Sequence, residues 1–220
     1  MRLPDLRVAC AHLGWLLERG YTAKAALKLV GDRFALDRRQ REGVLRATCS
    51  PTQVTARARR EVRARALPEL WLDGFNVLTT VEAALSGGAV LACADGCYRD
   101  LANMRGTWRR VAETEQAAVH IGELLAAASV QSVVWWLDAP VGNSGRLAAM
   151  LRELAAERRW PWRVAVVGDP DQQLSQDDVA IATADSAVLD RDVRWVNLAR
   201  AVVATLDAVW LVDLDADVSS

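Results

Sequence analysis

The sequence has 220 residues, of which 52% are hydrophobic and 25% charged, the usual balance of a globular protein. Its longest apolar stretches fall short of the roughly 18 residues that suggest a membrane span, and its N-terminus lacks the apolar core of a signal peptide, so we expect a cytoplasmic protein with no membrane partner. The four cysteines have no spacing typical of a zinc site, and we expect reduced, partly buried thiols.

The net charge of −1 hides two oppositely charged parts of the chain. Residues 1–70 contain 15 Lys and Arg against 7 Asp and Glu, whereas residues 71–220 contain 12 against 21. This asymmetry indicates two modules, a basic one over residues 1–65 and an acidic one over residues 66–220. The basic module suits a polyanion such as nucleic acid, and the acidic module suits metal ions or simply a solvated surface.

The basic module is predicted to be a small all-helical domain. Helices are expected over residues 4–18, after Thr22, after Asp37 and after Ser50, where each of these three residues is a favourable N-cap. Nine arginines lie between positions 38 and 65, and the pattern is compatible with a helix-turn-helix-like module. The alternative is a helical bundle with solvated arginines. The candidates for binding nucleic acid here are Arg38, Arg39, Arg59 and Arg60.

From residue 66 onward, short apolar runs alternate with helical patterns. Strands are expected to end near residues 73, 138, 169 and 185, a fifth is expected in VRWVNL, and VWLVDL is a candidate edge strand. A long helix is expected from Tyr98 to Ala128, and another after Asn143. Strands that are apolar throughout and alternate with helices predict an α/β fold, a three-layer sandwich with a mainly parallel five-stranded sheet.

Aspartates follow four of the five predicted strands. They are Asp73, Asp138, Asp169 and Asp185. Since the carboxyl ends of parallel strands share one edge of the sheet, we expect these side chains to converge where open α/β sheets bind ligands. Carboxylates held together repel one another, which raises some of their pKa values or demands a cation, and such a group of oxygens suits Mg²⁺ or Mn²⁺. The alternative for each aspartate is an ordinary helix cap or turn residue.

Several other residues are predicted to lie near the same edge. Asn76 follows Asp73 by three residues and is a candidate for orienting it or a water molecule. Asn143, Ser144 and Arg146 lie at a predicted helix start, where free backbone N–H groups favour a phosphate. The further candidate acids are Asp100, where a helix is expected to lean over the site, Asp178, which is a solvated loop residue unless its loop folds inward, and Asp190, which is as readily a surface residue.

Two short motifs resemble those of PIN-like nucleases, including the NYN group. They are LDGFN at residues 72–76 and TADSAVLD at residues 183–190. The resemblance covers residues 69–200 in the order of elements, and it implies that Asp73 and Asp185 are metal ligands, with Asn76 as a helper. The NYN pattern often has a second acid two residues after the last aspartate, but this position is Ala187. A second metal site then needs another acid, from among Asp100, Asp178 and Asp190.

The whole chain is also similar to an uncharacterised prokaryotic family with the same layout, a helical N-terminal region followed by an α/β domain. The similar stretches include RGYTAKAALKLVGDRFALDRRQR, LDGFNVLTTVEAALSGG, DGCYRDLA, LDAPVGNSGRL and ATADSAVLD. This resemblance implies the domain boundaries and no activity.

The sequence therefore predicts a nuclease that depends on Mg²⁺ or Mn²⁺ and hydrolyses phosphodiester bonds in RNA or single-stranded DNA. The main alternative is a non-catalytic nucleic-acid-binding protein with a degenerate PIN-like domain. A phosphatase with a D-x-D motif is disfavoured because position 75 is Phe, and VGNSGRL lacks the lysine of a nucleotide-binding P-loop. The assembly state is left open, with a homo-oligomer among the alternatives.

Overall fold

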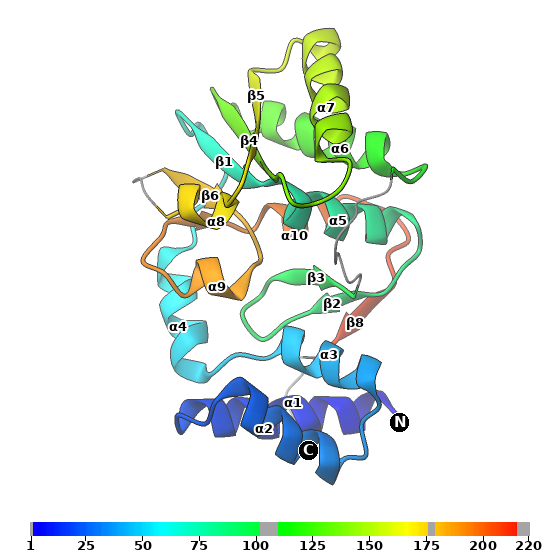
Figure 1. Cartoon of the computed structure of the whole chain (residues 1–220), viewed down its shortest axis with the longest axis vertical. Helices are drawn as coiled ribbons and strands as arrows, with labels where there is room; N and C mark the ends of the chain where they lie inside the picture. Colours follow the sequence, from blue (N-terminus) through cyan, green and yellow to red (C-terminus); the bar gives the residue numbers. More distant parts are fainter. Residues whose placement is uncertain (1, 102–109, 176–178, 215–220) are drawn as a thin grey trace.

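The computed structural model describes residues 2–101, 110–175 and 179–214. The first three N-terminal helices lie below two β-sheets, and the fourth rises beside the smaller sheet toward the larger one (Figure 1). The longer helices of the second half pack against the larger sheet. None of the helices in these three ranges has the length and apolar character that crossing a membrane demands.

The four N-terminal helices are confirmed, and their starts follow from N-caps. The side chains of Thr22, Asp37 and Ser50 each accept a hydrogen bond from a backbone N–H three residues later. The side chains of Gln40 and Gln53 accept a hydrogen bond from the backbone N–H of Asp37 and Ser50, which completes a capping box at the third and fourth helices. The helices are α1 (Leu3–Glu18), α2 (Ala23–Arg33), α3 (Arg38–Ala47) and α4 (Pro51–Arg60).

The larger sheet has five strands, all parallel, as the apolar runs predict. Its order is β5-β4-β1-β6-β7, so the chain builds outward from β1 to β4 and β5 and then returns to add β6 and β7 on the other side of β1. The strand order therefore reverses between β1 and β6, and open α/β sheets bind ligands at such a switch point. The strands are β1 (Leu70–Asp73), β4 (Val133–Asp138), β5 (Trp162–Val167), β6 (Ala180–Ala182) and β7 (Trp195–Val196).

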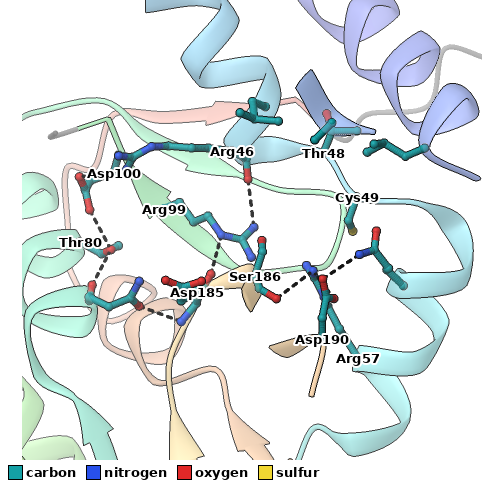
Figure 2. Close-up of a pocket in the computed structure, with 16 residues that line it drawn as sticks. Arg46, Thr48, Cys49, Arg57, Thr80, Arg99, Asp100, Asp185, Ser186 and Asp190 are labelled. Atoms are coloured by element: carbon teal, nitrogen blue, oxygen red, sulfur yellow. Dashed lines mark hydrogen bonds and ion pairs between the residues drawn. The ribbon is translucent and has the colours of Figure 1, made fainter. Parts of the chain in front are cut away.

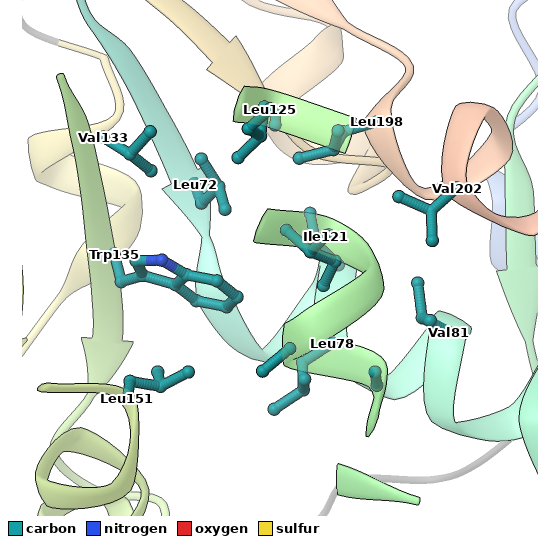
Figure 3. Packing of buried hydrophobic residues seen from close by; sticks show 14 of the residues in the cluster. Leu72, Leu78, Val81, Ile121, Leu125, Val133, Trp135, Leu151, Leu198 and Val202 are labelled. Carbon is teal, nitrogen blue, oxygen red and sulfur yellow. The ribbon is translucent and has the colours of Figure 1, made fainter. Parts of the chain in front are cut away.

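Helices lie on both faces of this sheet, as expected for three layers. Alternate strand residues such as Leu72, Val133 and Trp135 pack with four helices into the main core (Figure 3). These helices are α5 (Gly74–Leu85), α6 (Thr114–Ala127), α7 (Ser144–Arg158) and α10 (Leu198–Val203). Trp71 and Trp136 point to the opposite face. That face is covered more thinly, by residues in and around α8 (Pro170–Gln173) and α9 (Ser186–Leu189).

A second sheet of three strands was not predicted. It consists of β2 (Val90–Ala92), β3 (Tyr98–Asp100) and β8 (Leu211–Asp213), in the order β3-β2-β8. The predicted helix from Tyr98 to Ala128 is therefore wrong at its start, and α6 begins only at Thr114. Gly96, at φ +76°, lies in the turn that folds β2 and β3 into a hairpin. The predicted edge strand in VWLVDL exists, but it pairs with β2.

The second sheet joins the N-terminal helices to the rest of the molecule. Residues of α1, α2 and α3 form one apolar cluster with Leu91 and Cys93 of the β2 hairpin and with Leu214. Helix α4 reaches the edge of the larger sheet, where the Val62 N–H donates to the carbonyl of Trp195 in β7. The helical region therefore shares its core with strands of the second half, and a domain boundary at residues 65 and 66 remains a prediction.

Gly74 directly follows Asp73 at the junction of β1 and α5, and neighbouring residues leave no room there for a side chain. A Cβ at this position would lie 2.5 Å from Cδ2 of Leu137 and 2.9 Å from the carbonyl oxygen of Trp136. We expect Gly74→Ala to lower the free energy of unfolding by about 1–3 kcal/mol, because an added methyl group overpacks the junction. Denaturant unfolding measures this change.

The matched control is Gly145→Ala in the first turn of α7, where an added Cβ meets no described atom within 4 Å. We expect this variant to be unchanged or stabilised by up to about 1 kcal/mol, since alanine is the better helix former. Equal stabilities of the two variants would contradict the close packing at Gly74.

Candidate functional site at the carboxyl edge of the sheet

A pocket of about 300 Å³ opens at the switch point, at the carboxyl ends of β1, β4 and β6. Five aspartates contribute to its lining, and Arg46 of α3 is the one cation among the described residues that line it. The carboxylates are Asp73, Asp100, Asp138, Asp171 and Asp185. The remaining lining residues are Phe75, Asn76, Thr79, Trp136, Val141 and Pro170. The pocket is therefore strongly acidic, as a cation site is.

Asp73 ends β1 and occupies the N-cap position of α5, but its side chain makes no cap hydrogen bond. Its Oδ2 accepts a hydrogen bond of 2.8 Å from the hydroxyl of Thr183. Burial raises the pKa of Asp73 to about 7, and the charges of Asp185 and Asp171 add to this effect against the opposing hydrogen bond from Thr183. The contacts of Asp73 therefore do not offset the cost of burying its negative charge, and a nearby cation would favour its ionised form.

Asp185 lies three residues beyond β6, on a turn that polar contacts hold in place. The backbone N–H of Asp185 donates to Thr183 Oγ1 at 3.0 Å, and the N–H of Ala184 donates to Asn76 Oδ1 at 2.8 Å. One carboxylate oxygen of Asp185 accepts the N–H of Ala187 and so caps the short helix α9. Asn76 therefore ties the start of α5 to the segment that carries Asp185, and Asp185 is both a pocket acid and a helix cap.

Asp138 and Asp171 complete the outer side of the pocket. Oδ1 of Asp138 is buried and has no hydrogen-bond partner among the described residues. Burial, followed by the charge of Asp169, raises the pKa of Asp138. Burial and then the charge of Asp185 raise the pKa of Asp171, although Arg191 opposes this from 3.9 Å. A buried carboxylate oxygen without a donor is costly, and a cation or its bound water would relieve that cost.

Asp100 lies on the opposite wall, where it is already engaged. Its Oδ2 accepts from the hydroxyls of Thr79 and Thr80, at 3.3 and 3.2 Å. Nη1 of Arg46 donates to the Asp100 carbonyl oxygen at 2.9 Å and lies 3.8 Å from Oδ1. These contacts favour a role for Asp100 in positioning Arg46 over a role as a metal ligand.

A second pocket of about 490 Å³ adjoins the acidic one and shares Arg46, Asn76, Asp100 and Asp185 with it. Figure 2 shows that it lies between the N-terminal helices, the β2–β3 hairpin and the segment around α9. The second pocket therefore extends the lined surface from the carboxylates toward residues of α1, α3 and α4.

The acids do not form a closed metal cage. Within the described ranges, no three Asp, Glu, His or Cys side chains are close enough together to hold a metal ion. Mg²⁺, however, usually keeps several waters and takes only one or two protein carboxylates together with substrate phosphates. The pair Asp73 and Asp185, which are electrostatically coupled, fits this open type of site. The site residues are thus compatible with a hydrated cation.

Thiol chemistry does not fit this region. All four cysteines are free and buried. Burial raises the pKa of Cys49 to about 12 and that of Cys93 to about 11, and it raises the pKa of Cys97 well above its usual range. Thiols that stay protonated are poor nucleophiles and poor zinc ligands.

The comparisons with known proteins identify the family. A family model described as a domain of unknown function (DUF5616) matches residues 64–201, and one described as a protein of unknown function (DUF434) matches residues 5–60. The chain belongs to the DUF5616 family. An uncharacterised protein of Methanocaldococcus jannaschii is 30% identical over 177 residues, which are 80% of this chain and 84% of that protein. No solved structure matches the chain significantly.

Most of the predicted acids of this DUF5616 chain converge, with three exceptions. Asp73, Asp100, Asp138 and Asp185 line the pocket together with Asn76. The candidate acid Asp190 lines the adjoining pocket instead, where its carboxylate accepts hydrogen bonds from Arg57 and Gln53. Asp169, expected among the converging acids, is exposed instead, and its Oδ1 caps α8 by accepting the N–H of Gln172. The predicted ligand Asp178 lies outside the described residues.

The predicted phosphate-binding residues at the start of α7 do not line the acidic pocket. Ser144 is buried and Arg146 is exposed, whereas Asn143 has a left-handed backbone with φ +70° and makes no side-chain cap hydrogen bond. Their role in binding a phosphate remains a prediction.

The four predicted arginines of the basic module differ in their surroundings. Arg39 and Arg59 are exposed, and Arg38 is exposed beside Glu42 at 3.3 Å. Arg60 instead donates to the carbonyls of Ala56, Leu189 and Arg191 and so fixes α4 to the segment after α9. Only the first three are well placed for a ligand in solvent.

Three residues of the site were not predicted from the sequence. Asp171 lies in the polar run DPDQQLSQDD, which reads as a loop, and only the Asp-Pro helix start signals its position. Thr183, two residues before Asp185, has an ordinary strand sequence around it. Arg46 reaches the pocket from the helical region, 27 residues before Asp73, and no local signal indicates this contact.

Proposed function

We propose that this chain is a nuclease that depends on Mg²⁺ or Mn²⁺ and hydrolyses phosphodiester bonds in RNA or single-stranded DNA. The observation that carries the proposal is the acidic pocket at the switch point of the sheet, where five aspartates face one arginine. Such an excess of carboxylates around a pocket of about 300 Å³ is unfavourable unless some of them take up protons or a cation binds.

Each side chain has a role that follows from its surroundings. Asp73 and Asp185 would hold a hydrated divalent ion from two neighbouring strand ends, with Thr183 and Asn76 fixing their orientation. Asp138, whose buried Oδ1 has no donor within the described part of the chain, would accept a hydrogen bond from a water on that ion. When bound, the ion would lower the pKa of a water and neutralise charge on the phosphate.

The substrate class follows from charge. Arg46 would attract a phosphate to the border of the two pockets, and the exposed arginines of α3 and α4 would add to the attraction of a polyanion. The likeness of LDGFN and TADSAVLD to PIN-like and NYN motifs supports the same class. Ala187 replaces the second acid of the NYN motif, which favours one metal ion over two.

The test is cleavage of labelled single-stranded RNA and DNA by the purified chain with Mg²⁺, Mn²⁺ or a chelator. We expect cleavage with either metal and none with the chelator. Salt-sensitive binding without cleavage at any metal would instead support the non-catalytic alternative, which the missing acid at Ala187 favours.

We also propose that the protein acts in the cytoplasm. All four of its cysteines are free, and Cys93 and Cys97 face each other across one hairpin without forming a disulfide. Thiols stay reduced in the cytoplasm, whereas secreted proteins tend to form disulfides.

A further inference from the structure

Arg57, Arg99 and Asp95 form a buried charged network beside the acidic pocket, and Asp190 joins it from the surface, with its side chain 39% exposed. Figure 2 shows Arg57, Arg99 and Asp190 of this network. Arg57 of α4 is 1% exposed and donates to the carboxylates of Asp95 and Asp190. Arg99 of β3 donates to both oxygens of Asp95, at 2.9 and 2.6 Å. The two positive and two negative charges balance.

The network joins three parts of the chain that are distant in sequence. Arg57 lies in the N-terminal helices, Asp95 and Arg99 lie in the β2–β3 hairpin, and Asp190 is the C-cap of α9. Arg57 falls within the segment matched by the DUF434 model, and the other three fall within the segment matched by the DUF5616 model. The network is therefore a polar connection between the two matched segments.

Burial of Arg57, Arg99 and Asp95 needs a reason beyond stability. Removing ions from water costs several kcal/mol each, and a buried ion pair often contributes no more to stability than apolar residues of the same volume. Burial alone would disfavour the ionised form of Asp95, but the hydrogen bonds and charge of Arg99, with the charge of Arg57, keep its pKa below the usual value. The carboxylate of Asp95 is thus a fixed anchor for both arginines.

The two arginines hold the backbone on both sides of Asp185. Nε of Arg99 donates to the carbonyl of Ala184 at 2.7 Å, opposite the N–H that Asn76 accepts. Nη2 of Arg57 lies 3.5 Å from the carbonyl of Ser186, and the same nitrogen donates to Asp190 at 2.6 Å. The residues before and after Asp185, and the far end of α9, are therefore all fixed by this network.

We propose that Arg57 and Arg99 are positioning residues that hold Asp185 in its cation-binding orientation, so that helix α4 and the β2–β3 hairpin complete the acidic site. This inference rests on the proposed function, because it assumes that Asp185 binds a divalent ion. Neither arginine needs to touch the ion or the substrate. Residues that orient metal ligands in this way typically alter metal affinity by about 10–100-fold when changed.

The test compares Asp190→Asn with Asp192→Asn in the full chain. Both variants remove one negative charge at nearly the same place. Asp190 binds Arg57 and Gln53, whereas Asp192 is fully exposed and makes a surface ion pair with Arg60 at 3.3 Å. Mn²⁺ affinity is measured by titration calorimetry at 25 °C, and the melting temperature is measured separately with a chelator. We expect Asp190→Asn to bind Mn²⁺ about tenfold more weakly than Asp192→Asn.

A second variant, Arg99→Lys, keeps the charge but loses the planar fork that reaches Asp95 and Ala184 together. We expect it to bind Mn²⁺ about tenfold more weakly than the wild type, with an unchanged circular dichroism spectrum. If Asp190→Asn and Arg99→Lys lower only the melting temperature and bind Mn²⁺ as tightly as Asp192→Asn, the network serves stability alone and the inference is overturned. If the wild type itself binds no Mn²⁺, the proposed function fails, and the inference fails with it.

Discussion

Asp73→Asn is expected to reduce metal-dependent cleavage by about 10³-fold while the protein stays folded. Asparagine has nearly the same shape and still accepts the hydrogen bond from Thr183, so the turn between β1 and α5 is preserved. It lacks the negative charge that would hold the divalent ion, and metal ions contribute several kcal/mol to phosphodiester hydrolysis, which corresponds to a loss of this size. Initial rates on a labelled oligonucleotide at saturating Mn²⁺ measure the effect.

The control for this prediction is Asp207→Asn. Asp207 is exposed between α10 and β8 and does not line the acidic pocket, so its substitution changes the net charge equally without touching the site. We expect its rate to stay within about twofold of the wild type, since a single exposed charge is largely screened by salt. Cleavage by Asp73→Asn at the rate of Asp207→Asn would refute the assignment of Asp73.

The second prediction concerns stability and pH without metal. The folded-state pKa of Asp73 is raised from 3.8 to about 7, chiefly by burial. Between about pH 4 and pH 7, the folded protein therefore keeps a proton on Asp73 that the unfolded chain has lost. The stabilising contribution is full below about pH 4, and it is lost as the pH rises through about 7. A shift of this size corresponds to at most about 4 kcal/mol.

Thermal unfolding from pH 4 to pH 8 with a chelator measures this effect as a difference between two proteins. Asp73→Asn has no such titration, so we expect the wild type to lose several degrees of melting temperature relative to the variant across this range. Above pH 7 the variant is expected to be the more stable protein. Adding Mn²⁺ at pH 8 should raise the melting temperature of the wild type only. Parallel pH curves for the two proteins would show that the pKa of Asp73 is ordinary.

The sequence predicts the larger sheet and two of its acids for a clear physical reason. Apolar strands of four to six residues followed by aspartate are local signals, and parallel pairing brings their carboxyl ends to one edge. Asp73 and Asp138 are therefore predictable without coordinates. Asp169 carries the same signal but caps α8, because the chain turns into a helix immediately after it. Local sequence cannot distinguish a cap from a pocket acid.

The rest of the site depends on contacts between distant residues. Strands β2 and β3 have only three residues each, too few to show a period, and so their hairpin is read as the start of a helix. Arg57 meets Asp95 and Asp190 across 38 and 133 residues of sequence. No motif links these positions. The arginine-rich sequence of α4 predicts a solvated helix, and only the fold shows that Arg57 is buried.

The most direct test of the metal-dependent site is a crystal structure of the wild type soaked in Mn²⁺, with anomalous scattering used to locate the ion. A peak in the pocket about 2.1–2.2 Å from carboxylate oxygens of Asp73 and Asp185, with waters completing the shell, is the predicted result. An empty pocket at millimolar Mn²⁺, with the five aspartates in their present positions, would contradict the assignment of this edge of the sheet as a metal-dependent active site.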